Sequence, residues 1–147
     1  MKHVKDIMTP RPAYCTTDTP LPEVAGLMVH FNCGEIPVVG SPDDLKPVGV
    51  ITDRDIVCRT IARSLNPMEM KAGDCMSSPA VMVTPDTRAD DCCNIMEKHE
   101  IRRVPVIDKA GRLCGIVSQA DIARSLPVAQ KSQFVESLSR PEGKKAA

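Results

Sequence analysis

The chain has few aromatic residues and no excess of charge of either sign. Among its 147 residues there are one Tyr, two Phe and no Trp, and 19 basic residues balance 19 acidic ones. Single-stranded nucleic acids and quaternary ammonium ligands bind to aromatic faces, and nucleic acid also needs a basic surface. We therefore expect no nucleic-acid partner, and a core built from aliphatic side chains.

Long apolar runs are also missing. No stretch approaches the 18 or so apolar residues of a membrane-spanning helix, and the first six residues, MKHVKD, are polar and unlike a secretory leader. We therefore expect a cytoplasmic protein that has no membrane partner. The length fits one compact body, or two subdomains of about half the chain each.

The seven cysteines include no Cys-x-x-Cys pair, and the three histidines give no spacing typical of a zinc site. An odd number of cysteines without such spacing favours buried thiols in a reducing compartment over a disulfide framework. The adjacent Cys92 and Cys93 leave a redox or soft-metal role open, although helical spacing allows at most one of them to reach solvent. We predict no metal site.

An internal duplication organises the chain. At an offset of 68 residues, 6–8 (Asp-Ile-Met) aligns with 74–76 (Asp-Cys-Met). The offset falls to 66 for 49–56 and 115–122, because the turn before the last strand is two residues shorter in the second repeat. The predicted parts are a first repeat over 1–65, a linker over 66–71, a second repeat over 72–126 and a partly disordered extension over 127–147.

Each repeat contains signals for a helix. Thr19-Pro20 predicts an N-cap followed by proline, and Thr87-Arg88-Ala89-Asp90 has the Thr-x-x-acid form of a capping box. Apolar residues then recur with the spacing of a helix that buries one face. These expected core positions are Leu21, Val24, Ala25 and Met28 in the first repeat and Ala89, Cys92, Cys93 and Met96 in the second.

Short runs rich in β-branched residues surround these helices and predict strands. A further helix is expected after Thr52 and after Ser118. The strands are expected over 13–16, 36–39 and 48–51, and over 81–84, 104–107 and 113–117. The predicted fold class is α+β, a mixed α/β arrangement of strand, helix, strand, strand and helix that occurs twice.

In both repeats the third strand ends in a hydroxyl residue that is followed three positions later by Asp. The segments are GVITDRD (49–55) and GIVSQAD (115–121). One interpretation is a capping box, in which hydroxyl and carboxylate bind free backbone N–H groups. The other is a ligand site: unpaired N–H groups at a helix start suit a phosphate, a carboxylate suits a ribose diol, and the glycine admits a ligand.

The order Asp-Ile-Met, Ile-Pro-Val-Val and Gly-Val-Ile-Thr-Asp-Arg-Asp-Ile, repeated over residues 4–126, resembles a tandem pair of cystathionine β-synthase (CBS) domains, the Bateman module. The resemblance implies two βαββα units that are related by a pseudo-two-fold axis and packed through their sheets. It implies two clefts for an adenosine ligand such as AMP, ADP, ATP or S-adenosylmethionine. It also implies a homodimer that regulates a protein on a separate chain and has no catalytic residues.

The resemblance assigns roles to individual residues. Asp55 and Asp121 match the aspartates that bind ribose. Arg102 and Arg103 match positions at which some members carry basic residues facing phosphate, whereas the first repeat has Gly34 there and Glu35 next to it. The predicted phosphate-binding residues are Thr52, Arg54, Ser118, Arg102 and Arg103.

The adenine walls are expected to come from the first strand of the opposite repeat. Apolar side chains suit the face of a purine, and backbone amides can bind its edge. The predicted walls are Met8, Pro12 and Ala13 beside Asp121, and Met76, Ala80 and Val81 beside Asp55.

An alternative to the sensor is an interaction scaffold that works without a ligand. In that case Asp55 and Asp121 act only as helix caps, and the adjacent cysteines or the C-terminal tail make the useful contacts. An enzyme is not predicted, because no Ser/His/Asp, Cys/His or metal-binding set recurs with usable spacing. The two remaining hypotheses differ in whether adenosine compounds stabilise the fold.

Overall fold

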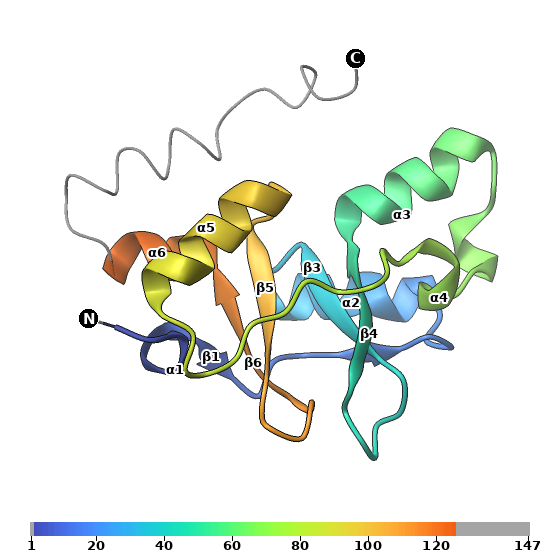
Figure 1. Ribbon diagram of the computed structural model, residues 1–147. Helices are drawn as coiled ribbons and strands as arrows, with labels where there is room; N and C mark the ends of the chain where they lie inside the picture. Colours follow the sequence, from blue (N-terminus) through green and yellow to red (C-terminus); the bar gives the residue numbers. More distant parts are fainter. Residues whose placement is uncertain (1, 126–147) are drawn as a thin grey trace.

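The computed structural model describes residues 2–125 (Figure 1). The predicted C-terminal extension over 127–147 lies outside these residues. The helices are α1 (Val4–Ile7), α2 (Leu21–Phe31), α3 (Asp53–Arg59), α4 (Ala72–Cys75), α5 (Ala89–His99) and α6 (Gln119–Ser125), with 3-10 turns η1 (Ile61–Arg63) and η2 (Pro67–Glu69). The strands are β1 (Thr9–Pro10), β2 (Cys15–Thr16), β3 (Glu35–Val39), β4 (Pro47–Thr52), β5 (Arg103–Ile107) and β6 (Leu113–Ser118).

Two three-stranded sheets form, and the N-terminal strand joins the sheet of the second repeat. One sheet has the order β2-β3-β4 and the other the order β1-β6-β5. Thr9 of β1 pairs with Ile116 of β6, and Ser77 of the second repeat pairs in return with Val50 of β4. Each repeat therefore gives its first segment to the other, and Figure 1 shows β1 beside β6.

The exchanged segments carry core residues with them. Val4 of α1 is fully buried in the cluster that contains Val104 and Ile122 of the second repeat. Ala72 of α4 is fully buried in the cluster of the first repeat, beside Val24. Because burial of apolar surface is the main stabilising term, neither repeat completes its core alone.

Most of the predicted strands are confirmed. The runs at 36–39, 48–51, 104–107 and 113–117 form β3, β4, β5 and β6. The run at 13–16 shortens to β2, which pairs in parallel with β3. The strand predicted at 81–84 is wrong, since only Val83 pairs there: its N–H donates to the Pro105 carbonyl (3.1 Å) and its own carbonyl accepts from the Ile107 N–H (2.9 Å).

The predicted helix caps at Thr19 and Thr87 are wrong. Each hydroxyl accepts from the backbone N–H three residues earlier, Thr16 at 3.0 Å and Thr84 at 3.1 Å. A threonine hydroxyl can close a turn in this way instead of capping a helix. α2 and α5 consequently begin later, after the N-cap residues Pro20 and Arg88, neither of which makes a side-chain capping hydrogen bond.

The helix faces follow the predicted pattern except at Ala25, which is exposed. Cys92 and Cys93 are both buried, and burial raises the pKa of their thiols to about 11 and about 12. They are therefore protonated at neutral pH, which argues against the redox role left open above. All seven cysteines are unpaired, but Cys58 is exposed, contrary to the expectation of buried thiols. No helix within residues 2–125 is long and apolar enough to cross a membrane.

Glu35 begins β3 and is the one acidic residue in an otherwise apolar buried strand. Its Oε2 atom accepts no hydrogen bond from the described residues. Burial raises the pKa of Glu35 to about 7; the positive charge of Arg103 opposes this shift and the negative charge of Asp55 adds to it. The carboxyl group is thus ionised only in part at neutral pH.

Gly49 and Gly115 sit where the exchanged segments cross the sheets. A Cβ atom on Gly49 would lie 2.6 Å from the carbonyl oxygen of Ser77, and one on Gly115 would lie 2.5 Å from Sδ of Met8. These glycines therefore make room for the opposite repeat. The expected role of admitting a ligand to the backbone is wrong, because protein atoms already fill that space.

We predict that Gly49→Ala lowers the free energy of unfolding by about 1–3 kcal/mol, because the Ser77 carbonyl is backbone and cannot move alone. Gly115→Ala costs less, since the end of the Met8 side chain can rotate. Gly26→Ala is the control: nothing lies within 4 Å of its Cβ, so it stabilises α2 by about 0.5–1 kcal/mol. Urea unfolding measures all three, and equal losses at positions 49 and 26 would contradict the packing argument.

We also predict that Glu35→Gln stabilises the fold above pH 8 by about 2–3 kcal/mol. Between pH 4.5 and 7 the folded wild type keeps a proton that the unfolded chain has lost, so its stability falls as pH rises through this window. The advantage of the variant therefore shrinks towards zero near pH 4.5. Chemical unfolding at several pH values measures it, with the exposed Glu69→Gln as control; parallel pH curves for both variants would contradict the prediction.

Candidate functional site

The two strand-to-helix junctions have the same hydrogen bonds. The Thr52 N–H donates to Oδ2 of Asp55 (3.0 Å), and the Asp55 N–H donates to the Thr52 hydroxyl (3.0 Å). In the second repeat the Ser118 N–H donates to Oδ2 of Asp121 (2.9 Å), and the Asp121 N–H donates to the Ser118 hydroxyl (3.2 Å). The capping interpretation is therefore confirmed at both junctions, and it uses one oxygen of each carboxylate.

The second oxygen of each carboxylate faces an arginine. Oδ1 of Asp55 lies 3.8 Å from a guanidinium nitrogen of Arg59, and Oδ1 of Asp121 accepts a hydrogen bond from Arg124. The two carboxylates are similarly buried, with side chains 16% and 12% exposed. A carboxylate oxygen offers more than one lone pair, so Oδ1 can accept from a ligand hydroxyl group wherever the neighbouring arginine leaves room for it.

The N–H groups at the start of α3 have partners within the protein. The Asp53 N–H donates to the Gly34 carbonyl (3.0 Å), and the Arg54 N–H donates to Oδ1 of Asp53 (2.8 Å). The Asp55 N–H is bound by Thr52. The expectation that this helix start offers unpaired N–H groups to a phosphate is therefore wrong, because side chains and one carbonyl already occupy all three.

A pocket of about 570 Å³ lies between the two repeats, at the starts of α3 and α6. All five predicted phosphate-binding residues line it, so residues of both repeats meet in one pocket. Asp55 and Asp121 are not among its lining residues. The pocket is lined by Gly34, Glu35, Thr52, Asp53, Arg54, Glu100, Ile101, Arg102, Arg103, Ser118, Gln119 and Ala120.

Equivalent positions of the two repeats contribute opposite charges to this central pocket. Glu35 and Arg103 are 68 residues apart and both line it, as do Gly34 and Arg102. Three guanidinium groups in total are balanced by three carboxyl groups. Since the pKa of Glu35 is about 7, its protonation makes the pocket positive.

The predicted adenine walls are brought together in part. Met8 contacts Gly115 of β6, the strand that leads to Asp121, and Met76 contacts Gly49 of β4, the strand that leads to Asp55. Ala13, however, packs against the core of the first repeat, whereas Met8 packs against the core of the second. Two members of one predicted wall thus belong to different cores. The other members, Pro12, Ala80 and Val81, are half-buried.

A second pocket, of about 250 Å³, lies beside Asp121 between α1 and α6. It is lined by Lys2, Asp6, Ile7, Asp121, Arg124 and Ser125. This pocket contains one of the two predicted ribose-binding aspartates and residues of the exchanged N-terminal segment. It therefore combines residues of both repeats, but none of the wall residues predicted beside Asp121 (Met8, Pro12 and Ala13) lines it.

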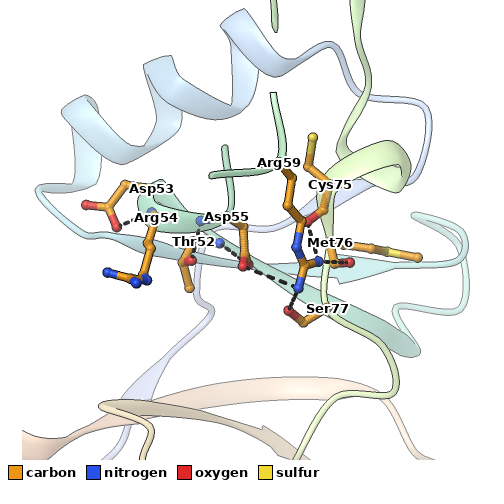
Figure 2. Close-up of polar contacts among 8 residues, drawn as sticks. All are labelled: Thr52, Asp53, Arg54, Asp55, Arg59, Cys75, Met76 and Ser77. Carbon is orange, nitrogen blue, oxygen red and sulfur yellow. Dashed lines mark hydrogen bonds and ion pairs between the residues drawn. The ribbon is translucent and has the colours of Figure 1, made fainter. Parts of the chain in front are cut away.

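Two residues of the site were missed by sequence reasoning. Glu35 was noted only as a replacement for an arginine, and Arg59 was not considered. Arg59 donates to the carbonyls of Cys75 and Met76, both at 2.8 Å, and to the Ser77 hydroxyl at 3.2 Å (Figure 2). The available signal was a difference between the repeats, since position 125, equivalent to Arg59, is serine.

Comparison with known proteins gives a consistent result. The family model of the CBS domain matches residues 4–59 and 72–128. Hypoxic response protein 1 of Mycobacterium tuberculosis is 36% identical over 141 residues, which cover 96% of each chain. Its crystal structure, which has two coordinated zinc ions, matches with a TM-score of 0.77 over 86% of this chain and 100% of that one. Within residues 2–125 of this chain no group of three His, Cys, Asp or Glu side chains could hold a metal ion.

Two further crystal structures contain adenosine compounds. CBSX2 of Arabidopsis thaliana in complex with AMP is 25% identical, with a TM-score of 0.72 over 90% of this chain and 99% of that one. The CBS domain pair of protein MJ0100, in complex with 5′-methylthioadenosine and S-adenosylmethionine, is 27% identical, with a TM-score of 0.75 over 85% and 95%. With the duplicated α+β fold and its exchanged first segments, these matches show that the chain belongs to the CBS domain family and is a tandem CBS pair, the Bateman module.

Proposed function

We propose that this protein is a cytoplasmic regulatory module that binds a phosphorylated adenosine compound at the seam between its two CBS repeats. The observation that carries the proposal is the central pocket, in which Thr52, Ser118 and three arginines meet at the starts of α3 and α6. Relatives with the same fold hold AMP or S-adenosylmethionine. No catalytic role is proposed, since relatives of full length are stand-alone CBS pairs.

The geometry links the ribose and phosphate parts of such a ligand. Thr52 and Ser118 each hydrogen-bond to the aspartate of their own junction and also line the central pocket. We propose that the ribose diol binds Oδ1 of Asp121 and that the phosphate occupies the central pocket beside Ser118, three residues earlier in the chain. Arg102 and Arg103 lie beside that position and can form charge-assisted hydrogen bonds with the phosphate.

Binding at the seam suits regulation, because the ligand contacts elements of both repeats at once. A ligand that bridges the repeats stabilises one arrangement of them relative to others. We propose that a homodimer of this chain transmits that arrangement to a separate protein. The seven unpaired cysteines are in keeping with a reducing compartment.

A ligand-independent scaffold is the second candidate. It is favoured by the capping boxes, which alone account for the positions of Asp55 and Asp121. The scaffold hypothesis does not explain the central pocket, however. It gives no role to a pocket of about 570 Å³ that is lined by three arginines and a buried carboxyl group.

We expect AMP at a hundred times its dissociation constant to stabilise the fold by about 2.7 kcal/mol, read as a rise in melting temperature. The double variant Asp55→Asn/Asp121→Asn loses this shift. Asn keeps the oxygen that caps the helix but not the charge or the full acceptor capacity for a diol. Asp74→Asn is the matched control, because Asp74 caps α4 through the Lys71 N–H (2.9 Å). The absence of any shift in wild type with AMP, ADP, ATP or S-adenosylmethionine would favour the scaffold.

We further expect Arg103→Gln to weaken AMP binding about ten- to a hundredfold, the loss of one charge-assisted hydrogen bond. Adenosine lacks the phosphate, so its affinity should change less than twofold. Titration calorimetry with both compounds measures the difference. Arg112→Gln, an exposed arginine that does not line the central pocket, serves as control. Equal weakening of AMP and adenosine by Arg103→Gln would contradict the assignment of phosphate to this pocket.

A further inference from the structure

The two predicted ribose-binding aspartates differ in how firmly their arginines are held. Figure 2 shows the guanidinium group of Arg59 between Asp55 and the segment 75–77. Its Nη1 atom donates to both the Cys75 and Met76 carbonyls at 2.8 Å. Its Nη2 atom lies 3.2 Å from the Ser77 hydroxyl and 3.8 Å from Oδ1 of Asp55. We call this set of contacts the Arg59 bridge. It connects α3 of the first repeat to the exchanged segment of the second.

The second repeat has no equivalent bridge. Ser125 occupies the position of Arg59, and its hydroxyl donates to the Ile122 carbonyl within its own helix (2.8 Å). Asp121 instead meets Arg124, whose side chain is 73% exposed, whereas that of Arg59 is 36% exposed. The guanidinium group of Arg124 is mostly exposed and is readily hydrated when it leaves the pair, so the pair contributes little. Asp121 can therefore release its arginine at small cost, and a pocket of about 250 Å³ lies beside it.

We propose that the Arg59 bridge closes the Asp55 cleft, so that each chain binds one adenosine ligand, at Asp121. A ribose diol at Asp55 would have to displace a guanidinium group that makes three further hydrogen bonds across the seam. Two of those bonds go to backbone carbonyls that would lose their charged donor. This inference rests on the proposed function and assigns its stoichiometry, with Arg59 as the residue that determines it.

The reciprocal exchange of the two residues tests the proposal. Calorimetric titration with AMP is expected to give one site per chain in the wild type. Arg59→Ser, which places the residue of the second repeat in the first, should open a second site with an affinity within about tenfold of the first. Ser125→Arg should weaken binding at Asp121 at least tenfold. Arg63→Ser, an exposed arginine on η1, is the control and should leave one site.

Single aspartate variants identify the occupied cleft. In the wild-type background Asp121→Asn should abolish AMP binding, whereas Asp55→Asn should change the affinity for AMP less than twofold. In the Arg59→Ser background each aspartate variant should remove one of the two sites. Two equivalent sites in the wild type, or loss of binding on Asp55→Asn alone, would overturn the proposal. So would a single site in a folded Arg59→Ser protein.

The same titrations distinguish a wrong stoichiometry from a wrong proposed function. If neither the wild type nor Arg59→Ser binds AMP, ADP, ATP or S-adenosylmethionine, the adenosine-binding function is wrong, and the claim about stoichiometry is overturned with it. Should Arg59→Ser fail to fold, Ser125→Arg still decides the matter, because it leaves the bridge and both cores intact. Unchanged AMP affinity in that variant would show that an arginine at this position does not close a cleft.

Discussion

The packing of Val4 and Ala72 into the cores of the opposite repeats is the contact on which the rest of the structure depends. Both are fully buried. Each brings a short helix across the seam and places the following residues against the last strand of the other repeat, at Gly49 and Gly115. The seam is therefore part of the hydrophobic core and keeps the two strand-to-helix junctions in fixed positions. The central pocket lies between the repeats for the same reason, because residues of both junctions line it.

Helix capping and ligand binding do not compete for the same atoms at these junctions. In each one, Oδ2 of the aspartate accepts from the backbone and holds the carboxylate in place, which leaves Oδ1 directed away from the helix start. A carboxylate fixed by its cap loses little further conformational entropy on binding a diol. The structural and functional interpretations of the Ser/Thr-x-x-Asp pattern are thus compatible, and the cap can orient the group that binds.

Much of the fold could be predicted because each element occurs twice in the sequence, so that the two copies can be compared. The runs that form β3 to β6 are too short for a helix and rich in β-branched residues, and both copies agree. The caps predicted at Thr19 and Thr87 were wrong because a threonine hydroxyl can close a turn as readily as it can cap a helix. The family resemblance predicted that the opposite repeat lines each cleft, but not that its first segment packs into the other core. The central pocket was not predicted either, since no local pattern tells which loops meet. Arg59 was missed because its partners, residues 75–77, lie far along the chain.

The differences between the repeats are concentrated where the fold does not require symmetry. Buried positions such as Val38 and Val106 are alike because both cores demand aliphatic side chains of similar volume. At the seam, however, Glu35 stands opposite Arg103 and Arg59 is equivalent to Ser125. Neither pair is needed to fill a core, and each changes the charge or the space offered to a ligand. A symmetric fold with an asymmetric seam has two junctions of the same backbone geometry but different side chains, and this difference is the basis for the proposal that the second repeat binds the ligand while Arg59 of the first connects the halves.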